Sequence, residues 1–219
     1  SFCSLHIGEV SNYSNANDPR VARETRKYLL PVNAQLIEGA SYLTSRTSGS
    51  NLMICTGVAH KLSKEGTVKA EISGHSAIWR AETMLSEGET VTLTKYSVFC
   101  DSIRYPDCVR DARSELTKAL SVPLQDYYDA QRAYLKSYWD NCLLEIKGDD
   151  ALTQAIYYNM YQLIQSVGKD EYCNIAAKGL SGEGYEGHYF WDTEMYIQPF
   201  FNLKQPSVTS NLIGFRYRT

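Results

Sequence analysis

The sequence predicts an α+β chain in which an antiparallel β-sandwich portion is followed by helices. Three observations support this prediction. The first two concern spacing: apolar residues alternate with polar ones before about residue 105, and they recur every three or four residues after it. The third observation is the order of the segments, because the strand-like stretches come first and the helical ones follow. This order argues against a doubly wound parallel sheet, in which strands and helices alternate.

The strand-like half consists of short alternating segments separated by turn residues. Apolar side chains alternate with polar ones over residues 68–72, and again over 91–93 after the turn-like Glu87–Gly88–Glu89. Further β-rich segments lie at residues 42–43, 52–55, 77–79 and 96–99, and a Thr/Ser/Gly cluster stands at 47–50. Short strands at close spacing with such turns indicate an antiparallel sandwich.

Two helical runs follow the strands. In the first, Val109, Ala112, Leu116 and Ala119 step by three and four residues, and Pro123 ends the run. The second extends over residues 127–146 with the same spacing. Stripes of aliphatic and aromatic side chains at this spacing are typical of core packing.

A third helical run covers residues 152–167. Asp149 and Asp150 stand at its start, where acidic groups stabilise the positive end of a helix by about 0.3 to 1 kcal/mol each. Gly168 follows the run, and we expect it to be the C-cap.

Composition excludes several classes of function. The net charge of −3 over 219 residues gives no reason to propose nucleic acid or an anionic membrane as a partner. No run of about twenty apolar residues is present, so a membrane span is not expected. The six cysteines are irregularly spaced, which favours reduced thiols in a cytosolic protein over a disulfide framework or a zinc site.

The two ends of the sequence are abrupt. It begins SFCSLHIGEV, without an initiator Met or a signal segment, and stops at NLIGFRYRT within a helical pattern. We therefore expect the chain to be a piece of a larger protein.

Residues 179–201, GLSGEGYEGHYFWDTEMYIQPFF, form the most distinctive segment. Gly182, Gly184 and Gly187 match the GxGxxG spacing of a dinucleotide site. Such a site requires an acidic residue about twenty positions further on, and none follows Glu194. The GK[ST] ending of a phosphate-binding P-loop is absent too, so we do not expect nucleotide binding.

A metal site is the second interpretation of this segment. His188, Asp192 and Glu194 are suitable ligand types. However, Asp192 and Glu194 are two residues apart, which places them on opposite sides of a helix, and no second histidine is near. We expect no metal here.

A carbohydrate pocket is the third interpretation. Sugars present apolar faces and a rim of hydroxyl groups. Trp191 can cover the face, and the neighbouring Asp192 can accept hydrogen bonds from two adjacent hydroxyls, each contributing about 1.5 to 3 kcal/mol. The structural alternative is that Asp192 or Thr193 only caps a helix over about 193–203. The residues alone leave both interpretations open.

The same segment resembles the start of the catalytic domain of glycoside hydrolase family 65. That family contains the maltose, trehalose, kojibiose and nigerose phosphorylases and some hydrolases, such as acid trehalase. Similar stretches flank the segment at residues 88–96, 144–149, 155–160, 174–178 and 216–218, with Phe215 where the family usually has Tyr. The similarity covers the chain from about residue 36 and is clearest from about 140 onward.

The resemblance implies a large cytosolic, often dimeric, multidomain enzyme. Residues 1–104 would be the C-terminal part of an N-terminal β-sandwich domain, 105–147 a helical linker, and 148–219 the first helices of an (α/α)6 catalytic barrel. The implied reaction is the inverting phosphorolysis of an α-glucosidic disaccharide to β-glucose 1-phosphate and glucose. Inorganic phosphate is the co-substrate and no cofactor is implied.

The resemblance also implies roles for individual residues. Trp191 and Asp192 would line the subsite for the non-reducing glucose, with Tyr189, His188 and Glu194 as adjacent substrate-binding candidates. The glutamate that acts as general acid is expected beyond residue 219, so this chain carries no catalytic residue and should not turn over alone. A hydrolase of the same family and a non-catalytic glycan-binding or structural sandwich module are the alternatives.

Overall fold

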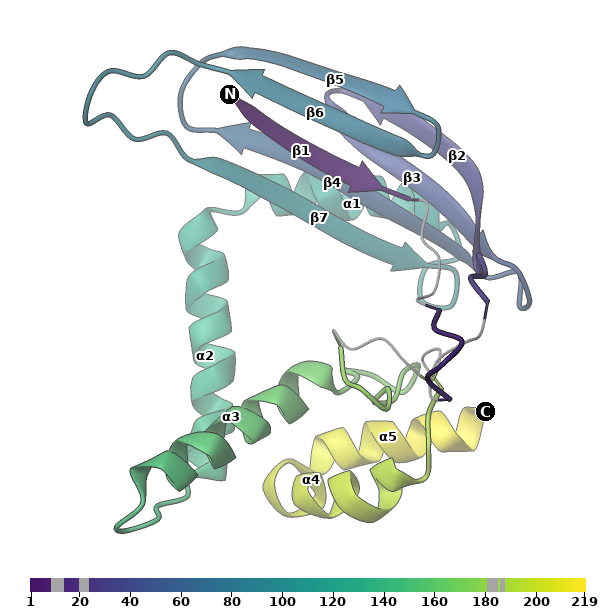
Figure 1. The fold of residues 1–219 in the computed structure, drawn as a ribbon, viewed down its shortest axis with the longest axis vertical. Coiled ribbons are helices and arrows are strands. Elements are labelled where there is room, and N and C mark those ends of the chain that lie inside the picture. The colour runs from purple at the N-terminus through teal and green to yellow at the C-terminus, as the bar shows by residue number, and fades with distance from the viewer. Residues whose placement is uncertain (9–13, 20–23, 181–184, 186–187) are drawn as a thin grey trace. The chain divides into compact units, whose positions relative to one another are not determined.

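The structure, a computed structural model, describes residues 1–8, 14–19, 24–180, 185 and 188–219 (Figure 1). It forms two compact units, Ser1–Ser11 with Arg26–Pro123, and Asn12–Thr25 with Leu124–Thr219. The predicted α+β class, with strands before helices, is confirmed. The domain boundaries expected at residues 104 and 147 stay a prediction. Of the helices in the described ranges, none is both long and apolar enough for a membrane span.

The first unit contains two antiparallel sheets, with strand orders β1–β6–β5 and β2–β3–β4–β7 (Figure 1). The strands are β1 Phe2–Ile7, β2 Leu29–Ile37, β3 Ala40–Thr47, β4 Met53–Leu62, β5 Thr67–Ser73, β6 Ser76–Glu82 and β7 Leu93–Asp101. The strands expected from the alternating segments are thus present. Val91 is a correction, because β7 begins two residues later, at Leu93.

The four-stranded sheet is covered on both faces. On one face, helix α1 (Cys108–Ser121) packs Ala112 and Leu116 against Cys55 and Cys100. On the other face lies the three-stranded sheet, whose His6 reaches across to the larger sheet. Because both faces are covered, β3 is buried at six successive positions, Ala40–Ser45, and lacks simple alternation.

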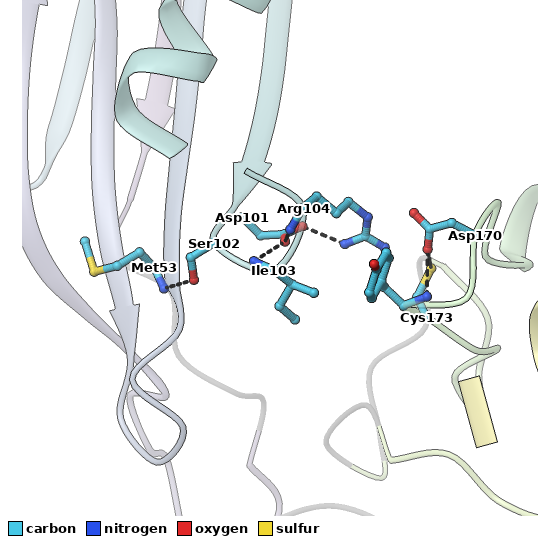
Figure 2. Close-up of polar contacts among 8 residues, drawn as sticks. Met53, Asp101, Ser102, Ile103, Arg104, Asp170 and Cys173 are labelled. Carbon is cyan, nitrogen blue, oxygen red and sulfur yellow. Dashed lines mark hydrogen bonds and ion pairs between the residues drawn. The ribbon is translucent and has the colours of Figure 1, made fainter. Parts of the chain in front are cut away.

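A capped turn connects β7 to the residues before α1 (Figure 2). The Oδ1 atom of Asp101 accepts hydrogen bonds from the backbone N–H groups of Ile103 and Arg104, at 2.9 and 3.0 Å, and Oδ2 forms an ion pair with Arg104 at 2.6 Å. Ser102 Oγ accepts a hydrogen bond from Met53 N at 3.0 Å. These contacts supply hydrogen-bond partners for backbone N–H groups at the end of the sheet, where the strand ladder stops.

The helices after α1 belong to the second unit. They are α2 Leu124–Cys142, α3 Asp150–Ser166, α4 Gln198–Lys204 and α5 Pro206–Arg218, with a π-helical turn over Thr193–Ile197 before α4. Their common core contains Tyr138, Cys142, Met160, Ile164, Val167, Ile175, Phe201, Val208 and Leu212. The stripes of the second and third predicted runs are core-facing only in their later parts, from Tyr138 in the second and from Ile156 in the third. The expectation of core packing was wrong for the earlier positions, which are exposed: Tyr127, Ala130, Tyr134 and Leu152.

The second predicted run is shorter than expected, since α2 ends at Cys142 and not at Ile146. The hydroxyl of Tyr157 on α3 accepts a hydrogen bond from Leu144 N at 3.2 Å and donates one to Leu144 O at 3.0 Å. These two bonds occupy backbone groups that a longer helix would use.

The third predicted run begins as expected and ends differently. Asp149 is the N-cap of α3, and its side chain accepts a hydrogen bond from Leu152 N at 2.8 Å. The C-cap is Val167, so the expectation for Gly168 was wrong by one residue. A Cβ atom on Gly168 would lie 2.5 Å from Cys173 Sγ, so glycine permits this close approach. The Cys173 thiol in turn contacts Asp170 (Figure 2).

Candidate functional site

The candidate site lies where residues 188–192 lead into the π-helical turn Thr193–Ile197. The backbone N–H of Gln198 bonds to Thr193 O, five residues back, which is the π-helical pattern. Pro199 follows and has no N–H to donate to the preceding turn, which gives a local reason for the irregular start of the helix. The helix expected over about 193–203 is present, but its π-helical start was not predicted.

Asp192 stands at the N-cap position of the π-helical turn, but its side chain does not cap the turn. Its backbone is helical, with φ −55° and ψ −30°, and its side chain makes no capping hydrogen bond. Its side chain is exposed to solvent. The capping interpretation of Asp192 is therefore wrong, and its carboxylate is available for another partner.

Asp192 lines a cavity of about 310 Å³ in the second unit. The cavity is formed by Ile175, Ala176, Ala177, Tyr185, Phe190, Asp192, Thr193 and Ile197. Its wall is thus largely apolar, with two aromatic rings and one carboxylate. Such a lining suits a ligand with an apolar face and hydroxyl groups at its edge.

The two aromatic rings of the lining also contact each other. Tyr185 and Phe190 meet edge to face, with their ring centroids 5.2 Å apart. Tyr185 has a φ of +53°, a left-handed conformation that is unusual for a bulky residue. His188 contacts the same residue, because its backbone N and its Nδ1 lie 2.9 and 2.6 Å from Tyr185 O.

Trp191 and Tyr189 stand beside this cavity lining in the sequence but are not part of it. The Trp191 side chain is 68% exposed, so its indole is free to contact a ligand. The Tyr189 ring meets Phe215 of α5 edge to face, with a centroid distance of 5.0 Å. The predicted sugar-binding roles of Trp191, Tyr189 and His188 stay predictions.

Glu194 is occupied by an ion pair. Arg216 of α5 donates from Nε to Oε1 at 2.8 Å and from Nη2 to Oε2 at 3.2 Å. The hydrogen bonds from Arg216 hold the pKa of the Glu194 carboxyl below its usual value. Glu194 is therefore charged and held by protein, and its predicted contact with substrate also stays a prediction.

Two earlier interpretations concern residues that are only partly described. Gly182, Gly184 and Gly187 of the GxGxxG match lie outside the described residues. Within the described ranges, no group of three or more His, Cys, Asp or Glu side chains is arranged to hold a metal ion.

Several residues of the site were not found from the sequence. Arg216 and the cavity residues 175–177 lie in stretches that carry the family resemblance, but nothing in their spacing relates them to Asp192. Tyr185 was not predicted as a site residue, because the interpretation of this loop concentrated on its glycines. Contacts between segments this far apart in the chain can be seen only in the fold.

Comparison with known families decides what the chain is. Residues 1–138 match the family described as "Glycosyl hydrolase family 65, N-terminal domain", and residues 157–219 match "Glycosyl hydrolase family 65 central catalytic domain". The chain belongs to glycoside hydrolase family 65. The resemblance carried by residues 179–201 and their flanks is thereby confirmed.

Several relatives of this family 65 chain are named as disaccharide phosphorylases. It is 37% identical to the α,α-trehalose phosphorylase of Geobacillus stearothermophilus over 96% of its own length and 27% of that protein. It is 33% identical to the kojibiose phosphorylase of Halothermothrix orenii over 84% of its length and 26% of that protein. The chain thus spans about a quarter of the length of these relatives.

A solved structure has the same fold. It is described as a putative kojibiose phosphorylase from human microbiome, and it matches 98% of this chain and 28% of its own with a TM-score of 0.79. The sequence identity is 24%, so this match bears on the fold alone.

Proposed function

We propose that this chain is part of a family 65 phosphorylase that cleaves an α-linked glucose disaccharide with inorganic phosphate. The observation that carries the proposal is Asp192, whose carboxylate makes no capping bond and lines a cavity with aromatic walls. Trehalose and kojibiose phosphorylases among the relatives support the class of reaction.

Asp192 would accept hydrogen bonds from two adjacent hydroxyls of the non-reducing glucose. Hydrogen bonds to a charged acceptor are worth about 1.5 to 3 kcal/mol, which is enough to orient a sugar. The exposed indole of Trp191 would cover an apolar face of the ring. Tyr189, His188 and Glu194 stand next to this pair and are the further candidates for substrate contact.

The chemical step would require residues outside this chain. An inverting phosphorylase uses one carboxylic acid to protonate the leaving oxygen, and phosphate itself is the nucleophile, so no general base is needed. We place the general acid beyond residue 219 and propose that residues 148–219 open an (α/α)6 barrel. We further propose a cytoplasmic, homodimeric enzyme that needs no cofactor, whose isolated residues 1–219 do not turn over.

Phosphate dependence tests the proposal. The full-length protein would be assayed on trehalose, kojibiose, maltose and nigerose, with and without phosphate, with detection of both glucose and glucose 1-phosphate. We expect one disaccharide to give equal amounts of glucose and β-glucose 1-phosphate only when phosphate is present. Release of glucose at the same rate without phosphate would assign the protein to the hydrolases of the family.

A further inference from the structure

Arg216 on α5 makes three hydrogen bonds to the segment that carries Trp191 and Asp192. Two go to the carboxylate of Glu194, at 2.8 and 3.2 Å, and the third goes from Nη2 to the carbonyl oxygen of Phe190 at 3.0 Å. These two partners lie on either side of Trp191 and Asp192 in the chain. One guanidinium group therefore holds both ends of the short stretch that contains the candidate sugar-binding pair.

A second contact from α5 supports the same segment. Phe215 precedes Arg216 and packs its ring edge to face against Tyr189, at a centroid distance of 5.0 Å. The helical backbone adds hydrogen bonds from Glu194 N and Met195 N to Trp191 O, at 3.0 and 3.2 Å. The position of Trp191 and Asp192 thus depends on the contacts of their neighbours.

The contacts from α5 hold the neighbours of Trp191 and Asp192 and not the side chains of these two residues themselves. The Asp192 carboxylate makes no capping hydrogen bond, and the Trp191 indole is 68% exposed. Phe190, by contrast, belongs to the cavity wall together with Asp192, and Arg216 holds its carbonyl. A guanidinium has five N–H donors in a rigid plane, so it can bind a carboxylate and a carbonyl together, which an ammonium group cannot match.

We propose that Arg216 is a positioning residue that acts through Phe190 and Glu194 to hold Asp192 at the cavity. The inference rests on the proposed function, since it assigns a purpose to the geometry of a sugar site. Arg216 need not contact the substrate, because its fork is directed at the protein. Displacing a positioned group by about 1 Å costs up to roughly a hundredfold in rate.

The test is a double-mutant cycle in the full-length protein, read by kcat and KM for its disaccharide and by calorimetric binding of D-glucose. Arg216→Gln removes the charge and the fork, and Asp192→Asn removes the charged acceptor. If Arg216 acts through Asp192, Arg216→Gln alone lowers kcat/KM by about 10- to 100-fold. The same change costs much less in the Asp192→Asn background, because residues that act together are not additive.

Arg218→Gln is the matched control. Arg218 lies two positions after Arg216 on the same helix, and its ion-pair partner is Glu171, which lies outside the segment of residues 189–194. It should leave both kcat/KM and glucose binding unchanged. Arg216→Lys is the second variant in case Arg216→Gln fails to fold. It keeps the positive charge and loses the planar fork of donors. We expect a loss of kcat/KM smaller than that of Arg216→Gln, with an unchanged thermal midpoint.

The possible results separate the two proposals. Wild-type glucose binding in Arg216→Gln, or a loss that adds fully to that of Asp192→Asn, would overturn the positioning role alone. Equal losses in Arg216→Gln and Arg218→Gln would also overturn it, because the effect would then follow from any ion pair on α5. Wild-type behaviour of Asp192→Asn would instead remove the sugar site and this inference with it.

Discussion

The two units of the molecule treat buried polar groups differently. In the sandwich, the side chains of the buried histidines form hydrogen bonds with hydroxyl groups. In the helical unit, three buried side-chain atoms within the described residues have no hydrogen-bond partner, namely Gln198 Nε2, Gln205 Oε1 and Thr209 Oγ1. An unpaired buried polar group costs about 1 to 3 kcal/mol. The buried histidines of the sandwich are thus hydrogen-bonded, whereas the unit that carries the candidate site leaves some buried polar groups unpaired.

The satisfied groups of the sandwich connect its two sheets. His6 on β1 reaches Ser41 on β3 with Nδ1 and Thr56 on β4 with Nε2, at 2.8 and 2.7 Å. In the opposite direction, His60 on β4 reaches Ser4 on β1 at 2.8 Å. The two sheets are therefore joined by polar bonds as well as by apolar packing.

A third histidine completes this arrangement. His75, between β5 and β6, bonds to Ser45 on β3 at 3.0 Å. His60 also stacks on Trp79 of β6, with ring centroids 4.4 Å apart. The difference is that buried histidine side chains hold the two sheets of the sandwich together, whereas in the helical unit the candidate site is held by the ion pair Arg216–Glu194.

Lowering the pH should produce the largest effect of these predictions, which is a loss of stability of the sandwich. Burial lowers the pKa of His6 and of His60 from 6.5 to about 4, and the positive charge of Lys95 adds to both shifts; His75 and His60 also face His6. The pKa of each of these histidines is lower in the folded than in the unfolded protein. The stability that depends on the neutral imidazole is therefore complete above pH 6.5. It is lost as the pH falls from 6.5 to 4. The loss is at most about 3 kcal/mol for each histidine.

The measurement is the free energy of unfolding by denaturant at several pH values between 7 and 4. Unfolding is monitored by a signal that reports on the strands. His6→Gln should flatten the curve, and the exposed His188→Gln should leave it unchanged. A curve that stays level from pH 7 to 4 in the wild type would contradict the role of the neutral imidazoles.

Matched leucines compare the two cores directly. Leu116 in the sandwich unit and Leu212 in the helical unit are both 0% exposed. Truncation to alanine should cost about 2 to 5 kcal/mol in either core. Hydrogen exchange should show faster exchange in β7 and α1 for Leu116→Ala, and in α3 and α5 for Leu212→Ala. Equal acceleration in both units from either change would show that the cores are not separate.

Asp192→Asn tests the helical unit in the full-length protein. The amide keeps the shape of the side chain and removes the charged acceptor, so it should cost about 1.5 to 3 kcal/mol of transition-state stabilisation, or tens- to more than a hundredfold in rate. Steady-state kinetics with the disaccharide and phosphate measure this loss. A thermal midpoint equal to that of the wild type is the control for folding.

Loss of the N-cap of α3 should have the smallest effect on stability. Asp149→Ala removes the hydrogen bond to Leu152 N and should destabilise the helical unit by about 1 kcal/mol. Asp150→Ala is the control, since it removes only a charge near the helix start and should cost less. Equal losses in thermal unfolding would contradict the assignment of Asp149 as the cap.

The β-rich segments of the sequence predicted β3 to β7, including the fully buried part of β3, but did not predict β1 and β2. In β1 the inward positions include Ser4 and His6, whereas Leu5 and Ile7 are half exposed, so the usual pattern is inverted. β2 contains Pro31 and an irregular register next to it, which weakens its strand signal. Both strands depend on partners across the fold, which local composition does not reveal.

The site was predictable in part for the same reason. Trp191 and Asp192 stand out because an indole next to a carboxylate suits a sugar. The role of Arg216 depends on a contact across 22 positions of sequence, and the cavity depends on residues 175–177 approaching Tyr185 and Phe190. A pattern read along the chain suggests the candidate binding residues, but only the fold shows which side chains hold them in place.

A structure of the full-length protein with bound D-glucose tests the central claim most directly. We predict a glucose ring in the cavity beside Phe190, with two adjacent hydroxyls within about 2.5 to 3.0 Å of the Asp192 carboxylate and the Trp191 indole against the ring. Glucose bound elsewhere, with Asp192 paired only to protein groups, would contradict it.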